Sequence, residues 1–206
     1  MTQADLVDIA LIGFAGFEVS DWFLRSVELE IKVSRGERSD VIVWRPEGLR
    51  TGREFAAALK ARAKIIMISG HATQDGRSIC GTAEEEWSHL DGLAEIGATS
   101  AVLLDTCYAA KVLPQLGRCL RSPVVGVGAG FAATGHKAKI LRYKDSVTVL
   151  ADVLRELCMP DNVDLSPEAV LGAVNRVNAG TRVSSSPSLQ PDTDARRRLL
   201  FTHEYP

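Results

Sequence analysis

The chain has 206 residues, of which 46% are hydrophobic, and this is enough to form one domain with a sizeable core. Its formal net charge of −2 provides no basic surface of the kind that binds nucleic acid or an anionic membrane, so neither is expected as a partner. No apolar run approaches the roughly 20 residues that a membrane-spanning helix requires.

Short apolar runs alternate with helical patterns through the first third of the chain. Strands are predicted at residues 8–13, 41–44 and 64–69, because these runs are apolar and rich in β-branched side chains. Helices are predicted between them at 20–33 and 51–62, where apolar residues recur at helical spacing. Continuous apolar strands separated by helices are typical of a parallel sheet covered on both faces, so the pattern predicts an α/β fold.

A turn signal and a further strand follow the third predicted strand. The pair Asp75-Gly76 favours a tight hairpin turn, which predicts a small β-ribbon directly after His71. A helix is expected at 88–96, and the apolar run at 101–105 is expected to form another buried strand. A helix that ends near Leu120 is expected after it.

The last third of the chain has a less regular pattern. A strand at 124–127 is expected to precede helices at 146–157 and 166–178. Residues 181–195 are rich in Ser, Pro and Asp, and are expected as a linker or an ordered loop. The apolar residues 199–201 form either a docked strand or a tail.

Gly126, Gly128 and Gly130 superficially have the spacing of a dinucleotide-binding loop. The pattern comes late in the chain, and no acidic residue ends a following strand at the expected distance. A tight turn is therefore favoured, and a flavodoxin-like or Rossmann-like small-molecule binder remains a weaker alternative.

A histidine and a cysteine each follow one of the predicted buried strands. His71 comes shortly after the strand at 64–69, and Cys107 shortly after the strand at 101–105. Parallel strands lie about 5 Å apart and working residues gather at their carboxyl ends, so the two side chains are expected to face each other over a cleft. An imidazole beside a thiol lowers the thiol pKa and yields a thiolate nucleophile. The alternative is that Cys107 is a buried structural cysteine.

The cysteines are scattered, and their spacing suggests neither a metal site nor a redox pair. No metal and no cofactor is therefore expected. The first residues lack the basic flank and apolar segment of a secretory signal, and scattered cysteines suit a reducing compartment, so a cytoplasmic location is predicted. The four cysteines are Cys80, Cys107, Cys119 and Cys158.

Two motifs resemble those of the caspase-like cysteine peptidases, a superfamily that includes caspases, metacaspases and CHAT-domain proteases. The apolar strand ending Ser69-Gly70-His71 is similar to the first motif, and the strand ending Asp105-Thr106-Cys107 is similar to the second. The resemblance spans roughly residues 8–130 and is specific only in these two motifs. Metacaspases and CHAT-domain proteases are most similar, since they too carry an aspartate two residues before the cysteine.

The resemblance implies a fold and a domain organisation. The expected fold is a three-layer sandwich, in which helices flank a mostly parallel central sheet. Residues 1–180 would form the caspase-like peptidase domain, and residues 181–206 would be a C-terminal extension.

The resemblance also implies a role for each motif residue. His71 would transfer protons, Cys107 would be the nucleophile, and the backbone amides of Ala72 and Cys107 would form the oxyanion hole. Position 72 is usually glycine in the superfamily, and alanine excludes backbone angles open only to glycine. Asp105 would line a pocket that selects Arg or Lys before the cleaved bond, through charge-assisted hydrogen bonds. The alternative role of Asp105 is to cap the following helix.

These observations together predict a cysteine endopeptidase that cleaves proteins or peptides after a basic residue, under the control of a regulatory partner or signal. Small bacterial members of the superfamily often act in stress or defence responses, which the resemblance implies here too. The main alternative is a caspase-like interaction or regulatory module that no longer cleaves. Ala72 favours this alternative, and the intact pair of His71 and Cys107 opposes it.

Overall fold

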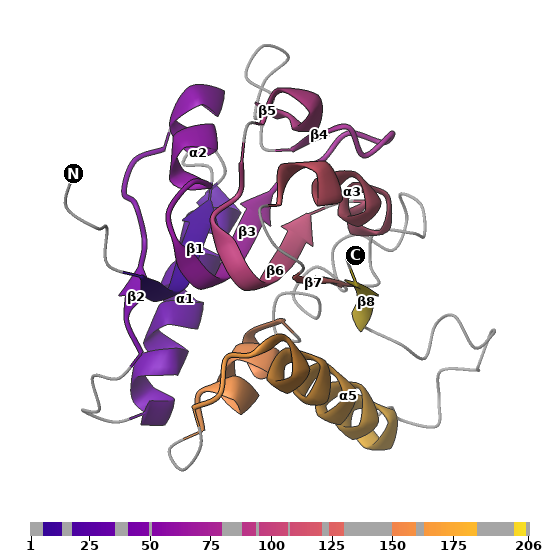
Figure 1. Ribbon diagram of the computed structural model, residues 1–206. Coiled ribbons are helices and arrows are strands. Elements are labelled where there is room, and N and C mark those ends of the chain that lie inside the picture. Colours follow the sequence, from indigo (N-terminus) through magenta and orange to yellow (C-terminus); the bar gives the residue numbers. More distant parts are fainter. Residues whose placement is uncertain are drawn as a thin grey trace.

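The computed structural model describes residues 6–13, 18–35, 41–49, 51–79, 88–93, 95–106, 108–120, 124–129, 150–159, 163–184 and 200–204. Its centre is a six-stranded sheet in the order β2-β1-β3-β6-β7-β8 (Figure 1). The strands of this sheet are β1 Val7–Gly13, β2 Val43–Trp44, β3 Ala63–Gly70, β6 Ala98–Thr106, β7 Val125–Ala129 and β8 Leu200–Glu204.

The central sheet is mostly parallel. Strands β2, β1, β3, β6 and β7 run in the same direction, and β8 runs antiparallel beside β7. Parallel neighbours need crossover connections, which carry helices over the faces of the sheet. The predicted α/β fold with a mostly parallel central sheet flanked by helices is confirmed.

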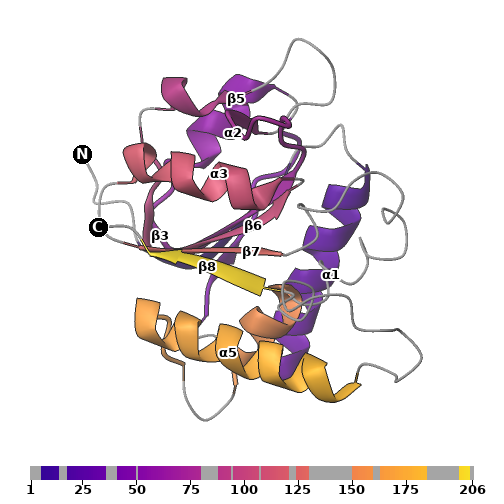
Figure 2. The same cartoon turned by 90° about the vertical axis from the view of Figure 1, so that its right-hand side faces the viewer.

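Helices cover both faces of the sheet (Figure 2). One core contains apolar side chains of α1, of α5 and of a helix over 150–157, and the other contains those of α2 and α3. The labelled helices are α1 Glu18–Arg35, α2 Gly52–Ala58, α3 Ala109–Leu116 and α5 Pro167–Ser184.

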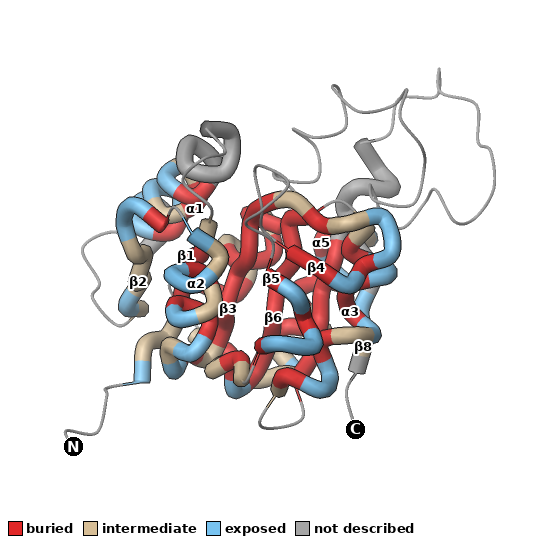
Figure 3. Tube along the Cα trace, turned by 90° about the horizontal axis from the view of Figure 1, so that it is seen from above, coloured by how far each residue is buried: buried red, intermediate tan, exposed pale blue. Residues whose placement is uncertain are grey.

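Side chains of the central strands alternate between these two cores. In β3, Ile65 and Met67 belong to the core that contains α1 and α5, whereas Ile66 and Ile68 belong to the core that contains α2 and α3. The strands are therefore buried on both sides, as the red segments of the tube show (Figure 3). This double burial explains why the sequence of each central strand is an uninterrupted apolar run.

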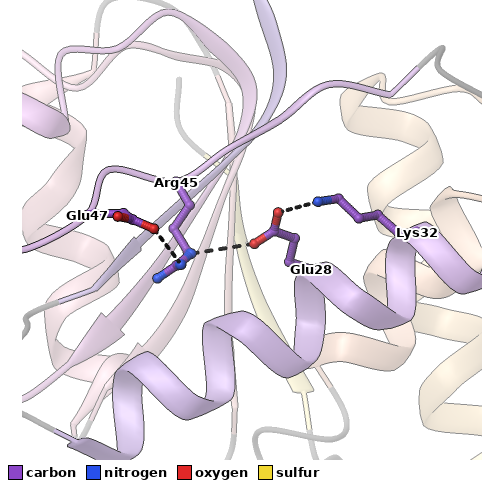
Figure 4. A network of polar contacts seen from close by, with 4 residues as sticks. All are labelled: Glu28, Lys32, Arg45 and Glu47. Atoms are coloured by element: carbon purple, nitrogen blue, oxygen red, sulfur yellow. Dashed lines mark hydrogen bonds and ion pairs between the residues drawn. The ribbon is translucent and has the colours of Figure 1, made fainter.

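Polar contacts join α1 to the segment that follows β2 (Figure 4). Arg45 Nε lies 3.5 Å from Glu28 Oε2, and Glu28 Oε1 accepts a hydrogen bond of 2.6 Å from Lys32 Nζ. Arg45 Nη2 lies 3.6 Å from Glu47 Oε1. The Arg45 side chain is only 11% exposed, so salt screens these ion pairs less than it screens fully exposed ones.

Helix α2 begins where the sequence predicts and ends earlier. Thr51 Oγ1 accepts a hydrogen bond from the Glu54 amide at 3.2 Å, and Glu54 Oε2 accepts one from the Thr51 amide at 3.0 Å, which forms a capping box. The helix ends at Ala58 rather than near residue 62. The Gly97 amide donates to the Leu59 carbonyl at 2.8 Å, and this contact belongs to the turn that leads into β3.

The helix predicted at 88–96 is wrong for the residues described there. Strand β5 (Ser88–His89) pairs antiparallel with β4 (Ser78–Ile79), and a single 3₁₀ turn, η1 (Leu90–Gly92), follows it. Pairing with β4 therefore overrides the local helical pattern, which carries only a weak preference by itself.

Two further expectations concern the C-terminal third. Gly126 and Gly128 lie inside β7, paired with β6 on one side and with β8 on the other, so they form neither a turn nor a phosphate-binding loop. Gly130 lies outside the described residues. Helix α5 continues to Ser184, beyond its predicted end, and Leu200–Glu204 form a strand of the sheet rather than a tail. Within the described ranges, no helix has both the length and the apolar content needed to cross a membrane.

Candidate active site

The two strands that precede His71 and Cys107 are immediate neighbours in the sheet. Strands β3 and β6 are parallel, with Ser69 paired to Asp105 and Gly70 paired to Thr106. Both strands therefore end at the same edge of the sheet, at the same level. His71 directly follows Gly70 and is half-buried. Cys107 follows Thr106 in the sequence and lies outside the described residues.

His71 leads into a tight hairpin, Ala72–Ile79, which we call the ribbon. Ala72 pairs antiparallel with Ile79, the Thr73 amide donates to the Ser78 carbonyl at 3.0 Å, and the Gly76 amide donates to the Thr73 carbonyl at 2.9 Å. Gly76 has a φ of +74°, a conformation that glycine adopts at little cost. The turn predicted from Asp75-Gly76 is therefore confirmed.

Side-chain bonds within the turn make the ribbon self-supporting. Thr73 Oγ1 donates to Asp75 Oδ1 at 2.6 Å and accepts from the Ser78 amide at 3.0 Å. Asp75 Oδ1 also accepts from the Arg77 amide at 3.0 Å, and these hydrogen bonds lower the pKa of the Asp75 carboxyl. The segment that follows His71 thus has a fixed internal geometry.

Ala72 presents its backbone amide away from the ribbon. Because Thr73 and Ser78 are the hydrogen-bonded pair, Ala72 and Ile79 form the adjacent non-hydrogen-bonded pair, whose amides point outward. Ala72 is not among the described residues with positive φ, so its backbone needs no glycine. Its side chain is buried in the core that contains α2 and α3. Alanine is therefore compatible with an outward amide donor at this position.

Asp105 is a buried carboxyl group at the end of β6. It is 3% exposed, and its Oδ2 accepts a hydrogen bond of 2.8 Å from Ser69 Oγ. Burial disfavours the charged form and raises the pKa of Asp105 to about 6, although the Ser69 hydrogen bond acts in the opposite direction. Both side chains lie on the face of the sheet covered by α1 and α5, in phase with Met67 and Leu103.

Asp105 does not cap the helix that follows it. The N-cap of α3 is Tyr108, which makes no side-chain capping bond, whereas the Asp105 carboxylate is bonded to Ser69. Ser69 was not singled out from the sequence. A usable signal was present, because Ser69 precedes His71 by the same two residues by which Asp105 precedes Cys107.

Tyr108 has an unusual backbone conformation at the turn between β6 and α3. Its φ of 58° and ψ of 26° are left-handed, and it is the one non-glycine residue with positive φ in the part of the chain described. A left-handed conformation costs about 1–2 kcal/mol for a residue with a side chain. Such strain concentrates at functional sites, where the surrounding structure holds it in place. Helix α3 begins at Ala109, directly after this residue.

Thr106 contributes a buried hydroxyl group beside this turn. Its Oγ1 has no hydrogen-bond partner among the described residues, and the residue is 8% exposed. Thr106 alternates with Asp105 along β6 and therefore lies on the opposite face, toward α3. A buried hydroxyl without a partner costs free energy in the folded protein.

Of the other histidines and cysteines, three with described contacts or burial lie on β5, after α3 and in the core that contains α1 and α5. His89 lies on β5 rather than on a helix, and its Nδ1 is 2.8 Å from Ser78 Oγ. Cys119 is buried and its thiol donates to the Leu90 carbonyl at 3.2 Å, and Cys158 is buried in the core that contains α1 and α5. Across the described ranges, no three His, Cys, Asp or Glu side chains gather as metal ligands would. Cys80 and His136 lie outside those ranges.

The chain matches no protein-family model and no curated protein sequence. Asp105 lies at the end of β6, and the half-buried residue His71 and the outward amide of Ala72 directly follow the end of β3, the neighbouring strand. In the sequence, a thiol follows directly after β6.

Proposed function

We propose that the protein is a cysteine endopeptidase that hydrolyses peptide bonds after arginine or lysine, with Cys107 as the nucleophile and His71 as its proton-transfer partner. The observation that carries this proposal is the pairing of Gly70 with Thr106 on adjacent parallel strands. These are the residues that immediately precede His71 and Cys107 in the chain. Parallel strands lie about 5 Å apart, and this spacing supports the proposal because residues that follow two adjacent strand ends can act on one peptide bond.

The reaction proceeds by acyl transfer through the sulfur. The Cys107 thiol passes its proton to His71, and the sulfur attacks the carbonyl carbon of the substrate, whose oxygen becomes an oxyanion. The amides of Ala72 and Cys107 donate to that oxyanion. The carbon–nitrogen bond then breaks, and the departing amine takes the proton from His71. Water attacks the resulting thioester, its proton passes by way of His71 to the sulfur, and the substrate leaves as a carboxylic acid.

The preference for a basic residue follows from the environment of Asp105. An ionised carboxylate that is almost completely buried is unfavourable, and burial holds its pKa at about 6. A substrate guanidinium or ammonium group that reached Asp105 would stabilise the ionised form, and Ser69 Oγ already orients one of its oxygens. Arginine gains most, because its planar fork can bond both carboxylate oxygens.

Two alternative functions, an inert caspase-like module and a small-molecule binder, each rested on one feature of the sequence. Ala72 has no positive φ, so the absence of glycine there does not argue for an inert module. Gly126 and Gly128 belong to a paired strand, so they give no support to a nucleotide-binding loop. Control by a regulatory partner or signal remains part of the proposal.

The direct test uses fluorogenic peptides that end in Arg, Lys or Asp before the reporter group. We expect cleavage of the Arg and Lys peptides, its loss in Cys107→Ala and in His71→Ala, and full activity in the control Cys80→Ala. An acyloxymethyl ketone carrying Arg should label Cys107 even if an activator is needed for turnover. The proposal would be refuted if the wild-type protein neither cleaved these peptides nor was labelled by the ketone.

Asp105→Asn separates specificity from chemistry. The amide retains the size of the carboxyl group and a hydrogen bond with Ser69 but has no charge for a basic substrate. We expect kcat/KM for the Arg peptide to fall at least tenfold, because a charge-assisted bond is lost. Alkylation of Cys107 by uncharged iodoacetamide should keep its wild-type rate. An unchanged kcat/KM would remove Asp105 from the pocket.

A further inference from the structure

The ribbon after His71 packs directly on the helix that follows Cys107. A Cβ atom added at Gly76 would lie 2.7 Å from the backbone carbon of Lys111 and 2.8 Å from its oxygen. Such distances are shorter than real Cβ contacts, so the backbone of the ribbon and the backbone of α3 touch at this point. The contact joins two segments that are remote in sequence, one of which follows His71 and the other Cys107.

Lys111 bridges the same two segments with its side chain. Its ammonium donates to the Gln74 carbonyl, in the turn of the ribbon, at 2.7 Å. The same ammonium lies 5.4 Å from the centre of the Tyr108 ring, within the range of a cation–π interaction. Lys111 thus contacts the third residue after His71 and the residue directly after Cys107.

Local hydrogen bonds hold each of the two partners that Lys111 connects. Hydrogen bonds between Thr73, Asp75 and Ser78 hold the turn that carries Gln74. Tyr108 is held by its carbonyl, which accepts from the amides of Lys111 at 2.7 Å and Val112 at 3.1 Å. An ammonium between a carbonyl dipole and an aromatic face therefore connects two self-supporting units.

We infer that Lys111 is a positioning residue for the proposed dyad, because it holds the ribbon that follows His71 against the start of α3, the helix that follows Cys107. This inference rests on the proposed function. Lys111 is not proposed to contact the substrate. Asp105, which would bind the basic side chain of the substrate, lies on the face of the sheet opposite to α3. Loss of the bridge should therefore slow the chemical step without weakening the binding of a basic substrate.

The main test compares Lys111→Met, Lys111→Arg and the control Lys60→Met, which changes another exposed lysine. Methionine keeps the apolar stem without the charge, and we expect kcat to fall by about 10- to 100-fold with KM changed by less than about threefold. Arginine can still donate to a carbonyl and stack on a ring, so Lys111→Arg should restore most of kcat. Lys60→Met should behave as wild type.

A second pair of variants approaches the same contact from the ribbon. Gly76 and Gly48 have φ values of +74° and +73°, but a Cβ at Gly48 would meet nothing within 4 Å. Alanine imposes the same backbone strain at both sites, and only Gly76→Ala pushes the ribbon away from α3. We expect Gly76→Ala to lower kcat as Lys111→Met does, and Gly48→Ala to keep the wild-type kcat.

Hydrogen–deuterium exchange keeps the test independent of turnover. Lys111→Met should speed exchange in the ribbon, Ala72–Ile79, and Lys111→Arg should not. If the wild-type protein cleaves and Lys111→Met retains both its kcat and its exchange rates, the inference fails and the proposed function stands. If the wild-type protein neither cleaves nor labels, the proposed function fails. Ribbon exchange then decides alone whether Lys111 holds the two segments together.

Discussion

At the scale of single residues, Asp105 is a carboxyl group whose pKa is raised by burial. Its pKa of about 6 lies above the ordinary value of 3.8, so the folded protein binds the proton more tightly than the unfolded chain does. The stabilising contribution of the protonated group is fully present below about pH 3.8 and is lost as the pH rises through 6. Above that pH, the buried charge costs roughly 3 kcal/mol of folding free energy.

Asp105→Asn should therefore stabilise the protein at neutral pH and have little effect in acid. We expect the free energy of unfolding of the variant to equal that of the wild type near pH 4 and to exceed it by up to about 3 kcal/mol above pH 7. Urea titrations monitored by circular dichroism between pH 4 and 8 would measure the difference.

Asp75→Asn provides the opposing control for this experiment. The pKa of Asp75 is lowered by hydrogen bonds from Thr73 and Arg77, so its carboxylate stabilises the fold above its ordinary pKa, and that contribution disappears as the pH falls. The free energy of unfolding of Asp75→Asn should thus fall below that of the wild type as the pH rises, and the two should become equal in acid. A constant difference between Asp105→Asn and wild type over the whole range would show that Asp105 is ionised at little cost.

At the scale of elements, the short connections around the site are set by close backbone contacts. The Gly97 amide donates to the Leu59 carbonyl at 2.8 Å, and the Ala63 amide donates to the Gly97 carbonyl at 3.3 Å. Gly97 thus fixes the start of β6 against the turn between α2 and β3. A Cβ at Gly97 would lie 2.1 Å from the Ala61 carbonyl oxygen, which is backbone and has little freedom to move.

Gly97→Ala should consequently destabilise the fold by about 2 kcal/mol or more, because two backbone segments must separate. The matched control is Gly92→Ala, where the added methyl group would meet nothing within 4 Å and the expected change is close to zero. Denaturant midpoints of the two variants would be compared with that of wild type. Equal midpoints for both variants would contradict the close approach at Gly97.

Local pattern and tertiary contact contribute differently to these elements. The runs that became β3 and β6 were predictable, because burial on both faces leaves an uninterrupted apolar sequence. The residues 88–96 carried a helical pattern and became β5 and η1, because β5 pairs with β4. The left-handed conformation of Tyr108 has no sequence signal, since it arises where β6 must turn into α3 within two residues.

At the scale of the whole molecule, β8 forms one edge of the six-stranded sheet, beside β7. Strand β8 pairs with all of β7, from Val125 opposite Glu204 to Ala129 opposite Leu200. Strand β7 in turn pairs with β6, the strand that ends before Cys107. Residues near the C-terminus therefore support the strand next to the candidate site.

Deletion of residues 200–206 should lower the melting temperature by about 10 °C or more, given that 1 kcal/mol corresponds to about 2–4 °C for a chain of this size. The deletion leaves the backbone groups of β7 unpaired at an edge, which also favours association between chains. Thermal unfolding and light scattering would measure both effects, with deletion of residues 205–206 alone as the control. Identical melting temperatures for the two truncations would mean that β8 contributes little to the fold.

The amino-acid sequence by itself determined the α/β class, the positions of the central strands, the turn at Asp75-Gly76 and the place of His71 and Cys107 after two strand ends. These features depend on periodicity and turn chemistry, which act over a few neighbouring residues. Only the tertiary structure decided that β3 lies beside β6, that Ser69 bonds Asp105 across 36 positions of sequence, and that Lys111 reaches the ribbon. Such contacts form when distant segments bury their apolar faces together, and no local pattern specifies them.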